Sequence, residues 1–142
     1  MYISRSIHID APPERVWQAT VDVERWPQFA AQFRRIERTD DGPLALAKKA
    51  RVTPRGFLAS EWLVTEYEDG RSFTWETDAL PGLHFVGGHI VEPEGDGTRA
   101  TMSLQSSGPV ALLITPAAFL VFRRNVRLEC EGLKKHCERG AS

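Results

Sequence analysis

The 142-residue sequence has almost no charge excess and few of the residues that build metal or cofactor sites. Its 18 lysines and arginines nearly balance 19 aspartates and glutamates, so the net charge is −1 and the pI is near 6.4. This balance gives no global electrostatic reason to bind nucleic acid or an anionic membrane. The four histidines are scattered, and no Cys-x-x-Cys, His-Glu-x-x-His or glycine-rich phosphate motif occurs. We therefore expect no metal, no cofactor and no nucleic-acid partner.

Cysteine is also scarce, with only Cys130 and Cys137 present. Seven residues along one predicted helix correspond to a rise of about 10 Å, which is too far for a disulfide. We expect both to be buried thiols that act as small hydrophobic side chains. The short basic clusters Arg34-Arg35 and Arg123-Arg124 are interpreted as solvated faces of a strand and a helix.

No apolar run is long enough to cross a membrane. Residues 110–122 are almost wholly apolar but contain Pro116, and a spanning helix needs about 20 apolar residues. This stretch predicts a core helix or a buried lid. The chain starts directly in a strand pattern without a signal peptide, so we expect a cytoplasmic protein with no integral membrane span. Its length and the absence of linkers predict a single domain, residues 1–142, present as a monomer or homodimer.

The N-terminal segment joins a strand to two short helices. Ile3, Ile7 and Ile9 alternate with polar residues, which predicts a half-buried strand over residues 2–9. Pro13 is favoured in the first turn of a helix and should begin one. Asp22 is expected to cap a second short helix, which Pro27 ends or kinks.

The rest of the chain predicts strands followed by one helix. Turn signals at intervals of about a dozen residues indicate an antiparallel meander. The six strands are expected near residues 33–39, 44–53, 57–67, 71–78, 83–92 and 98–106. From Leu112 to Cys137 apolar residues recur every three or four positions, as on one face of a helix, which Gly140 should end. The predicted fold class is α+β, with a seven-stranded antiparallel sheet wrapped around a long C-terminal helix.

Several short motifs, in this order, resemble the START-type helix-grip superfamily (SRPBCC), and specifically its polyketide cyclase/dehydrase and lipid-transport branch. They are Ala11-Pro12-Pro13-Glu14-Arg15-Val16-Trp17, Asp22 to Trp26-Pro27, Trp62-Leu63-Val64-Thr65-Glu66, Val91-Glu92-Pro93 before Asp96-Gly97-Thr98, and Glu131-Gly132-Leu133-Lys134. The resemblance covers nearly the whole chain. It implies a helix-grip fold with an apolar cavity between the sheet and the last helix, but it does not imply a particular reaction.

Large side chains on the faces expected to point inward are the candidates for lining such a cavity. The candidate ligand-binding residues are Trp26, Phe29, Phe33, Trp62, Phe73, Trp75, Phe85, Met102 and Phe119. On strand 83–92 we take Leu83, Phe85, Gly87, His89 and Val91 as the inward set, although Gly87-Gly88 is a candidate bulge that would change the register. The same rings could instead fill the interior. A cavity of roughly 300–1,000 Å³ is the expected size for a small-molecule site.

Two histidines are the candidate catalytic residues. His89 is predicted to point inward, and His84 lies beside the Pro81-Gly82 turn near the expected cavity mouth. An imidazole in either place could act as a general acid or base, or hydrogen bond to a ligand. Burial would disfavour the charged form of His89 unless a carboxylate such as Glu129 lies beside it. Arg5 is expected to pair with Glu129 or Glu131, or to hold a ligand carboxylate.

Three functions remain open from sequence. The first is binding, transport or sequestration of a small hydrophobic, aromatic or lipid-like ligand. The second, which the resemblance raises, is a polyketide cyclase or dehydratase that uses a pocket histidine, although no catalytic triad can be assembled from the spacing. The third is a protein-interaction module that uses the apolar segment 110–122 as its contact surface.

Overall fold

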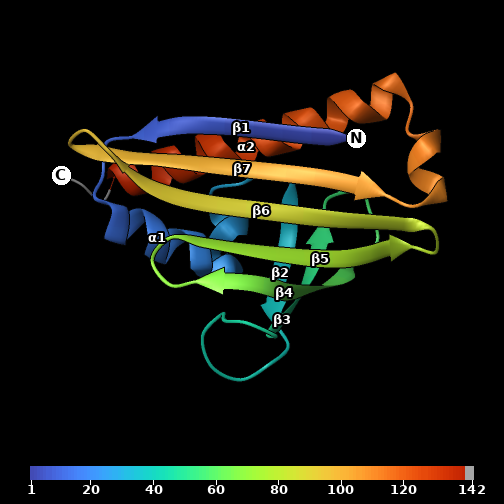
Figure 1. Cartoon of the computed structure of the whole chain (residues 1–142), viewed down its shortest axis with the longest axis horizontal. Coiled ribbons are helices and arrows are strands. Elements are labelled where there is room, and N and C mark those ends of the chain that lie inside the picture. The colour runs from blue at the N-terminus through green and yellow to red at the C-terminus, as the bar shows by residue number, and fades with distance from the viewer. Residues whose placement is uncertain (140–142) are drawn as a thin grey trace.

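Seven antiparallel strands curl around one long helix in the computed structural model, which describes residues 1–139 (Figure 1). The strands are β1 (Tyr2–Ile9), β2 (Phe33–Arg38), β3 (Lys49–Pro54), β4 (Ser60–Glu68), β5 (Ser72–Leu80), β6 (Leu83–Glu94) and β7 (Gly97–Ser107). Their order in the sheet is β1-β7-β6-β5-β4-β3-β2, so β1 closes one edge by pairing with β7. The predicted α+β class and strand number are confirmed.

Two short helices follow β1, as the sequence indicates. They are α1 (Pro13–Val21) and the 3-10 helix η1 (Val23–Gln28). The expected cap is wrong, because the Asp22 side chain makes no capping hydrogen bond and instead pairs with Arg25 at 3.2 Å. Pro27 lies inside η1, which ends one residue later.

The strand expected over residues 44–53 is shorter, because β3 begins only at Lys49. Leu44 is buried in a loop, and Ala47 has a positive φ of 67°, a conformation that interrupts an extended strand. Asp40 accepts a hydrogen bond from the Lys49 backbone N–H at 2.8 Å and so fixes the end of this loop. The alternation of Val52 and its neighbours therefore marks the strand correctly, but the apolar residues before it belong to the loop.

The inward face of β6 is as predicted. Phe85, His89 and Val91 are buried, and the pairing of β6 with both neighbours runs through Gly87 and Gly88 without a shift. The expected bulge there is absent. Register shifts occur instead between Asp78 and Leu80 on β5 and between Val64 and Glu66 on β4.

The C-terminal segment is two helices, not one. A short 3-10 helix, η2 (Pro109–Leu113), precedes the long helix α2 (Pro116–Arg139), and Pro116 stands at the first position of α2. The buried residues of α2 all lie beyond its first turns: Val126, Cys130, Gly132, Leu133 and Cys137. The first part of α2, before Val126, therefore contributes no buried residue, and Phe122 is its contact with the sheet, with its ring centroid 5.4 Å from that of Phe85. The expected helix end at Gly140 lies outside the described residues.

A glycine allows α2 to approach the loop after η1. A Cβ at Gly132 would overlap the carbonyl oxygen of Phe29, although alanine would otherwise favour the helix by about 1 kcal/mol. The Phe29 ring also stacks on His136, with centroids 4.7 Å apart. The second half of α2 is thus held between the sheet and this loop.

Both cysteines are buried free thiols, as predicted. Burial raises the pKa of Cys130 to about 12 and that of Cys137 to about 11. Both thiols therefore stay protonated and unreactive near neutral pH.

Leu133→Ala should lower the free energy of unfolding by about 2–5 kcal/mol, because Leu133 is only 1% exposed and its loss leaves a cavity against the sheet. Lys135→Ala, on the exposed side of the same helix, is the control and should be nearly neutral. Urea denaturation of both variants measures the difference. Equal losses would contradict this packing of α2.

Candidate functional site

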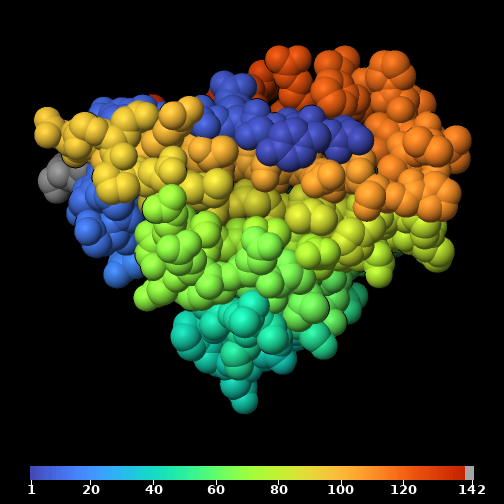
Figure 2. Space-filling view, viewed as in Figure 1, coloured from blue at the N-terminus to red at the C-terminus, as the bar shows by residue number. Residues whose placement is uncertain are grey.

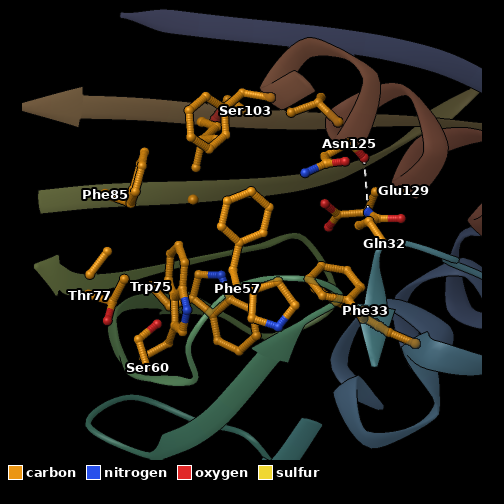
Figure 3. Close-up of a pocket in the computed structure, with 18 of the residues that line it drawn as sticks. Gln32, Phe33, Phe57, Ser60, Trp75, Thr77, Phe85, Ser103, Asn125 and Glu129 are labelled. Atoms are coloured by element: carbon orange, nitrogen blue, oxygen red, sulfur yellow. Dashed lines mark hydrogen bonds between the residues drawn. The ribbon is translucent and has the colours of Figure 1, made fainter. Parts of the chain in front are cut away.

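A cavity of about 370 Å³ lies between the inner face of the sheet and the stretch of α2 from Phe122 to Glu129 (Figure 3). This volume falls within the expected range for small-molecule sites. Its walls come from the loop after η1, from β3 to β7 and from α2. The lining residues are Trp26, Gln32, Phe33, Pro54, Phe57, Leu58, Ser60, Trp62, Trp75, Thr77, Ala79, Leu80, Leu83, Phe85, Gly87, His89, Ser103, Leu104, Phe122, Asn125, Val126 and Glu129.

The structure brings six of the eleven candidate residues to this cavity. They are Trp26, Phe33, Trp62, Trp75, Phe85 and His89. Those on strands are at positions whose inward direction follows from alternation, and Trp26 comes from the helix before β2. The aromatic side chains therefore form walls around a space and do not fill it.

Four other candidates do not line the cavity. Phe29 stacks on His136, away from the cavity. Phe73 is 0% exposed and Met102 is 3% exposed, so both lie in the closed core beneath the cavity. Phe119 lies in the first part of α2, one turn before Phe122, and is 36% exposed.

Aromatic contacts hold the cavity wall rigid. The ring centroid of Trp26 lies 5.4 Å from that of Trp75 and 5.6 Å from that of Phe33. The Trp26 Nε1–H donates a hydrogen bond to the carbonyl oxygen of Ala19 at 3.3 Å. Trp75 in turn lies 5.4 Å from Trp62. Such ring pairs stabilise one arrangement beyond the effect of burial alone.

The absence of a side chain at Gly87 makes room for one of these rings. A Cβ there would lie 3.0 Å from Nε1 of Trp75 and 3.5 Å from the Trp62 ring. Any larger residue would therefore push the indoles into the cavity. Gly87 lies within a strand, where glycine often marks such a close approach.

His89 is fixed on the cavity wall by three contacts. Its ring stacks on Phe73 with centroids 4.2 Å apart and an interplanar angle of 14°. Nδ1 lies 3.3 Å from the Phe73 carbonyl oxygen, and Nε2 lies 3.2 Å from Oε1 of Glu129 on α2. The sequence suggested Glu129 both as a neighbour of His89 and as a partner of Arg5, and in the structure it lies beside His89.

These contacts orient the His89 ring. A carbonyl oxygen only accepts, so the hydrogen bond to Phe73 is donated by Nδ1–H. Nε2 then faces Oε1 of Glu129 across 3.2 Å, and both residues line the cavity. An imidazole and a carboxyl group are the side chains that most often serve as general acids and bases.

Further polar groups lie on the α2 side of the cavity. The Gln32 side-chain Nε2 donates to the backbone carbonyl of Asn125 at 2.9 Å (Figure 3). The other end of that amide, Oε1, is buried and has no hydrogen-bond partner among residues 1–139. A buried acceptor without a donor is costly, so a hydroxyl or amide of a ligand that reached it would be stabilised.

His84 is not at the cavity. It lies on the outer face of the sheet, where Nδ1 is 2.8 Å from Asp78 and Nε2 is 2.8 Å from Glu76. The hydrogen bonds to Asp78 and then to Glu76 raise the pKa of His84, and the His84 hydrogen bond lowers the pKa of Glu76. The prediction that His84 lies at the cavity mouth is wrong, because side chains alternate along β6: Phe85 points inward and His84 therefore points outward. Of the two expected partners of Arg5, the structure shows Glu131, at 3.9 Å.

Sequence reasoning missed several lining residues, notably Gln32, Phe57, Asn125 and Glu129. Asn125 and Glu129 are four residues apart on α2, so they share one face of the helix, and this spacing was the available signal. Gln32 and Phe57 lie outside regular strands, where no periodicity indicates direction.

Comparison with known proteins agrees with this architecture. The profile of the polyketide cyclase/dehydrase and lipid transport family matches residues 2–138, nearly the whole chain. The chain belongs to that family. A search of curated proteins found no match.

Solved structures show that this family member has the helix-grip fold. A hypothetical protein from Helicobacter pylori superposes with a TM-score of 0.84 at 17% identity, covering 96% of this chain and 88% of the other. A protein from Thermus thermophilus gives a TM-score of 0.80 at 20% identity over 100% of both chains. The ginseng major latex-like protein 151 from Panax ginseng gives 0.73 at 10% identity, covering 96% and 97%. At these identities the likeness concerns the fold alone.

His84→Gln should destabilise the protein most in mildly acid solution. Because the folded pKa of His84 is raised above its unfolded value of about 6.5, its stabilisation is complete below that pH and is lost as the pH rises through the folded pKa. The lowered pKa of Glu76 sets the acid limit, because its contribution is lost as pH falls through that value. Urea denaturation should show the largest difference from wild type near pH ~5–6 and a smaller one near pH ~9. A difference that grows with pH would contradict the arrangement.

Proposed function

We propose that this protein binds a small hydrophobic, aromatic or lipid-like molecule in the cavity under α2. The single observation that carries the proposal is the cavity of about 370 Å³ with aromatic walls, between a sheet and a helix whose buried residues begin only at Val126. A folded chain gains stability by closing such an apolar space, so a maintained space favours an apolar ligand.

The lining also indicates the shape of that ligand. Trp62, Trp75 and Phe122 offer flat apolar surfaces, whereas Gln32 and Glu129 bring polar atoms to one side. A molecule with an apolar body and one hydroxyl or amide group would match both. Family membership, through its lipid-transport description, supports the same class of ligand.

We include a cytoplasmic location in this proposal. The two cysteines remain free thiols, which fits a reducing compartment.

A fluorescent apolar probe, N-phenyl-1-naphthylamine, tests the binding site. The wild-type protein should bind it saturably with an increase in probe emission. Leu104→Trp should weaken binding at least tenfold, because Leu104 lines the cavity beside Gly87 on the neighbouring strand and a larger side chain would occupy the space.

Ile90→Trp, on the outer face of β6, is the matched control and should bind the probe like wild type. Both variants are first checked for an unchanged unfolding transition. Equal probe binding by all three proteins, or none by wild type, would overturn the proposal.

A second candidate function is proton transfer on a cyclic ketone, as in a cyclase or dehydratase. It is favoured by the His89–Glu129 pair, which lies on the cavity wall with Nε2 of His89 3.2 Å from Oε1 of Glu129. In this role the pair would remove a proton from the carbon next to the carbonyl and return it elsewhere on the substrate.

Exchange of the α-hydrogens of 2-tetralone in D₂O, followed by NMR, tests this second function. If His89 transfers the proton, His89→Gln should lower the exchange rate by roughly 10²–10⁴ while 2-tetralone binding changes only a few-fold. His136→Gln is the control, because His136 lies against Phe29 and outside the cavity. No protein-dependent exchange, or an unchanged rate in His89→Gln, would leave only the binding function.

A further inference from the structure

Exposed apolar side chains lie at the opening of the cavity and on η2 and α2 nearby. They come from the β3–β4 connection, the β5–β6 turn, η2 and the start of α2. We call them the mouth patch, and they are Phe57 (60% exposed), Leu58 (81%), Leu80 (46%), Leu112 (87%), Leu113 (76%) and Leu120 (61%). Phe57, Leu58 and Leu80 also line the cavity. The patch is therefore continuous with the inner wall.

The patch is held in place by the backbone. The Val110 N–H donates to the carbonyl of Gly82 at 2.9 Å, which ties η2 to the β5–β6 turn. Ala111 and Ile114 complete the short helix with further backbone bonds, and none of the residues of η2 is buried. Leu112 and Leu113 thus stay exposed on an ordered segment. Figures 1 and 2 show this segment in orange, next to the β5–β6 turn at one end of the molecule.

Cations outnumber acids in the segments that carry the mouth patch. Residues 54–60 contain Arg55 and no acid, and residues 108–128 contain Arg123, Arg124 and Arg127 and no acid, although Arg127 pairs with Glu131 at 4.0 Å. Arg123 and Arg124 are exposed and have no ion-pair partner within the part of the chain that the structure describes. The acid closest in sequence to the β5–β6 turn, Asp78, is bound to His84. All 19 acids lie outside these two segments, although the whole chain has a net charge of −1.

We infer that the mouth patch docks on the surface of an anionic lipid bilayer, so that a ligand passes between the bilayer and the cavity. Exposed leucines enter the interface of the headgroups and acyl chains, and neighbouring arginines attract anionic headgroups. Among residues 1–139 no helix is long and apolar enough to cross a bilayer, so the contact is peripheral. This docking rests on the proposed function, because it places the opening of a ligand cavity against the source of the ligand.

Flotation of the protein with vesicles tests the inference. The wild-type protein should bind vesicles of equal parts phosphatidylcholine and phosphatidylglycerol, bind phosphatidylcholine vesicles less, and lose binding in high salt. Leu112→Ser with Leu113→Ser should weaken binding roughly tenfold or more, and Arg123→Gln with Arg124→Gln should weaken it about tenfold on the anionic vesicles. Leu46→Ser, at an exposed leucine outside the patch, and Lys135→Gln, far along α2, are the matched controls.

Each outcome supports or overturns the docking. The docking is overturned if the wild-type protein does not bind vesicles, or if binding is unchanged by the substitutions at Leu112, Leu113, Arg123 and Arg124. Conversion of a dimer into a monomer by the leucine variant, without a change in vesicle binding, also overturns it and would assign the patch to a second copy of the chain. Binding of N-phenyl-1-naphthylamine in solution separates this test from the proposed function, because Leu112 and Leu113 do not line the cavity and their variants should still bind the probe.

Discussion

The close contact between α2 and the loop after η1 is the constraint on which the rest of the structure depends. Gly132 lets the helix backbone meet the Phe29 carbonyl, and the buried stripe around it packs α2 only from Val126 onward. The C-terminal part of the helix is thus fixed by packing, whereas its first turns contribute no buried residue. Phe122 still meets the sheet, with its ring centroid 5.4 Å from that of Phe85, but a space remains between the sheet and the helix from Phe122 to Glu129, and this space is the cavity.

The site inherits its rigidity from that arrangement. Glu129 reaches His89 because it lies within the packed part of α2, between the buried residues Val126 and Cys130. On the sheet side, Phe73 supports the His89 ring from the core by stacking and by its carbonyl. Phe73 is therefore a positioning residue and not part of the cavity wall. An aromatic residue can matter to a site without touching what occupies it.

Much of the sheet could be predicted from the sequence, because side chains along a strand alternate strictly between its two faces. Once one residue is assigned to the inner face, the direction of every other residue in that strand follows. That rule placed Trp62, Trp75, Phe85 and His89 correctly and excludes His84, whose neighbour Phe85 has the opposite direction. Alternation identifies inward-pointing residues but does not tell whether they face a closed core or a cavity. Phe73 and Met102, which lie in the core, therefore had the same sequence pattern as Trp75, which lines the cavity. Nor could alternation reveal Gln32 or Glu129, since their positions depend on how α2 crosses the sheet, a tertiary property that no local pattern encodes.

Net charge proved the least informative quantity in the sequence, for a physical reason. It sums over the whole surface, whereas a partner in physiological salt responds only to charges within about 8–10 Å. The acids and bases of this chain nearly cancel in number, but two acid-free segments lie far apart in sequence and meet beside the cavity opening. The fold, not the composition, brings them together. The same course of α2 that leaves the cavity between it and the sheet also leaves apolar side chains such as Leu120 exposed at the start of the helix, so one constraint produces both the space and the surface around its entrance.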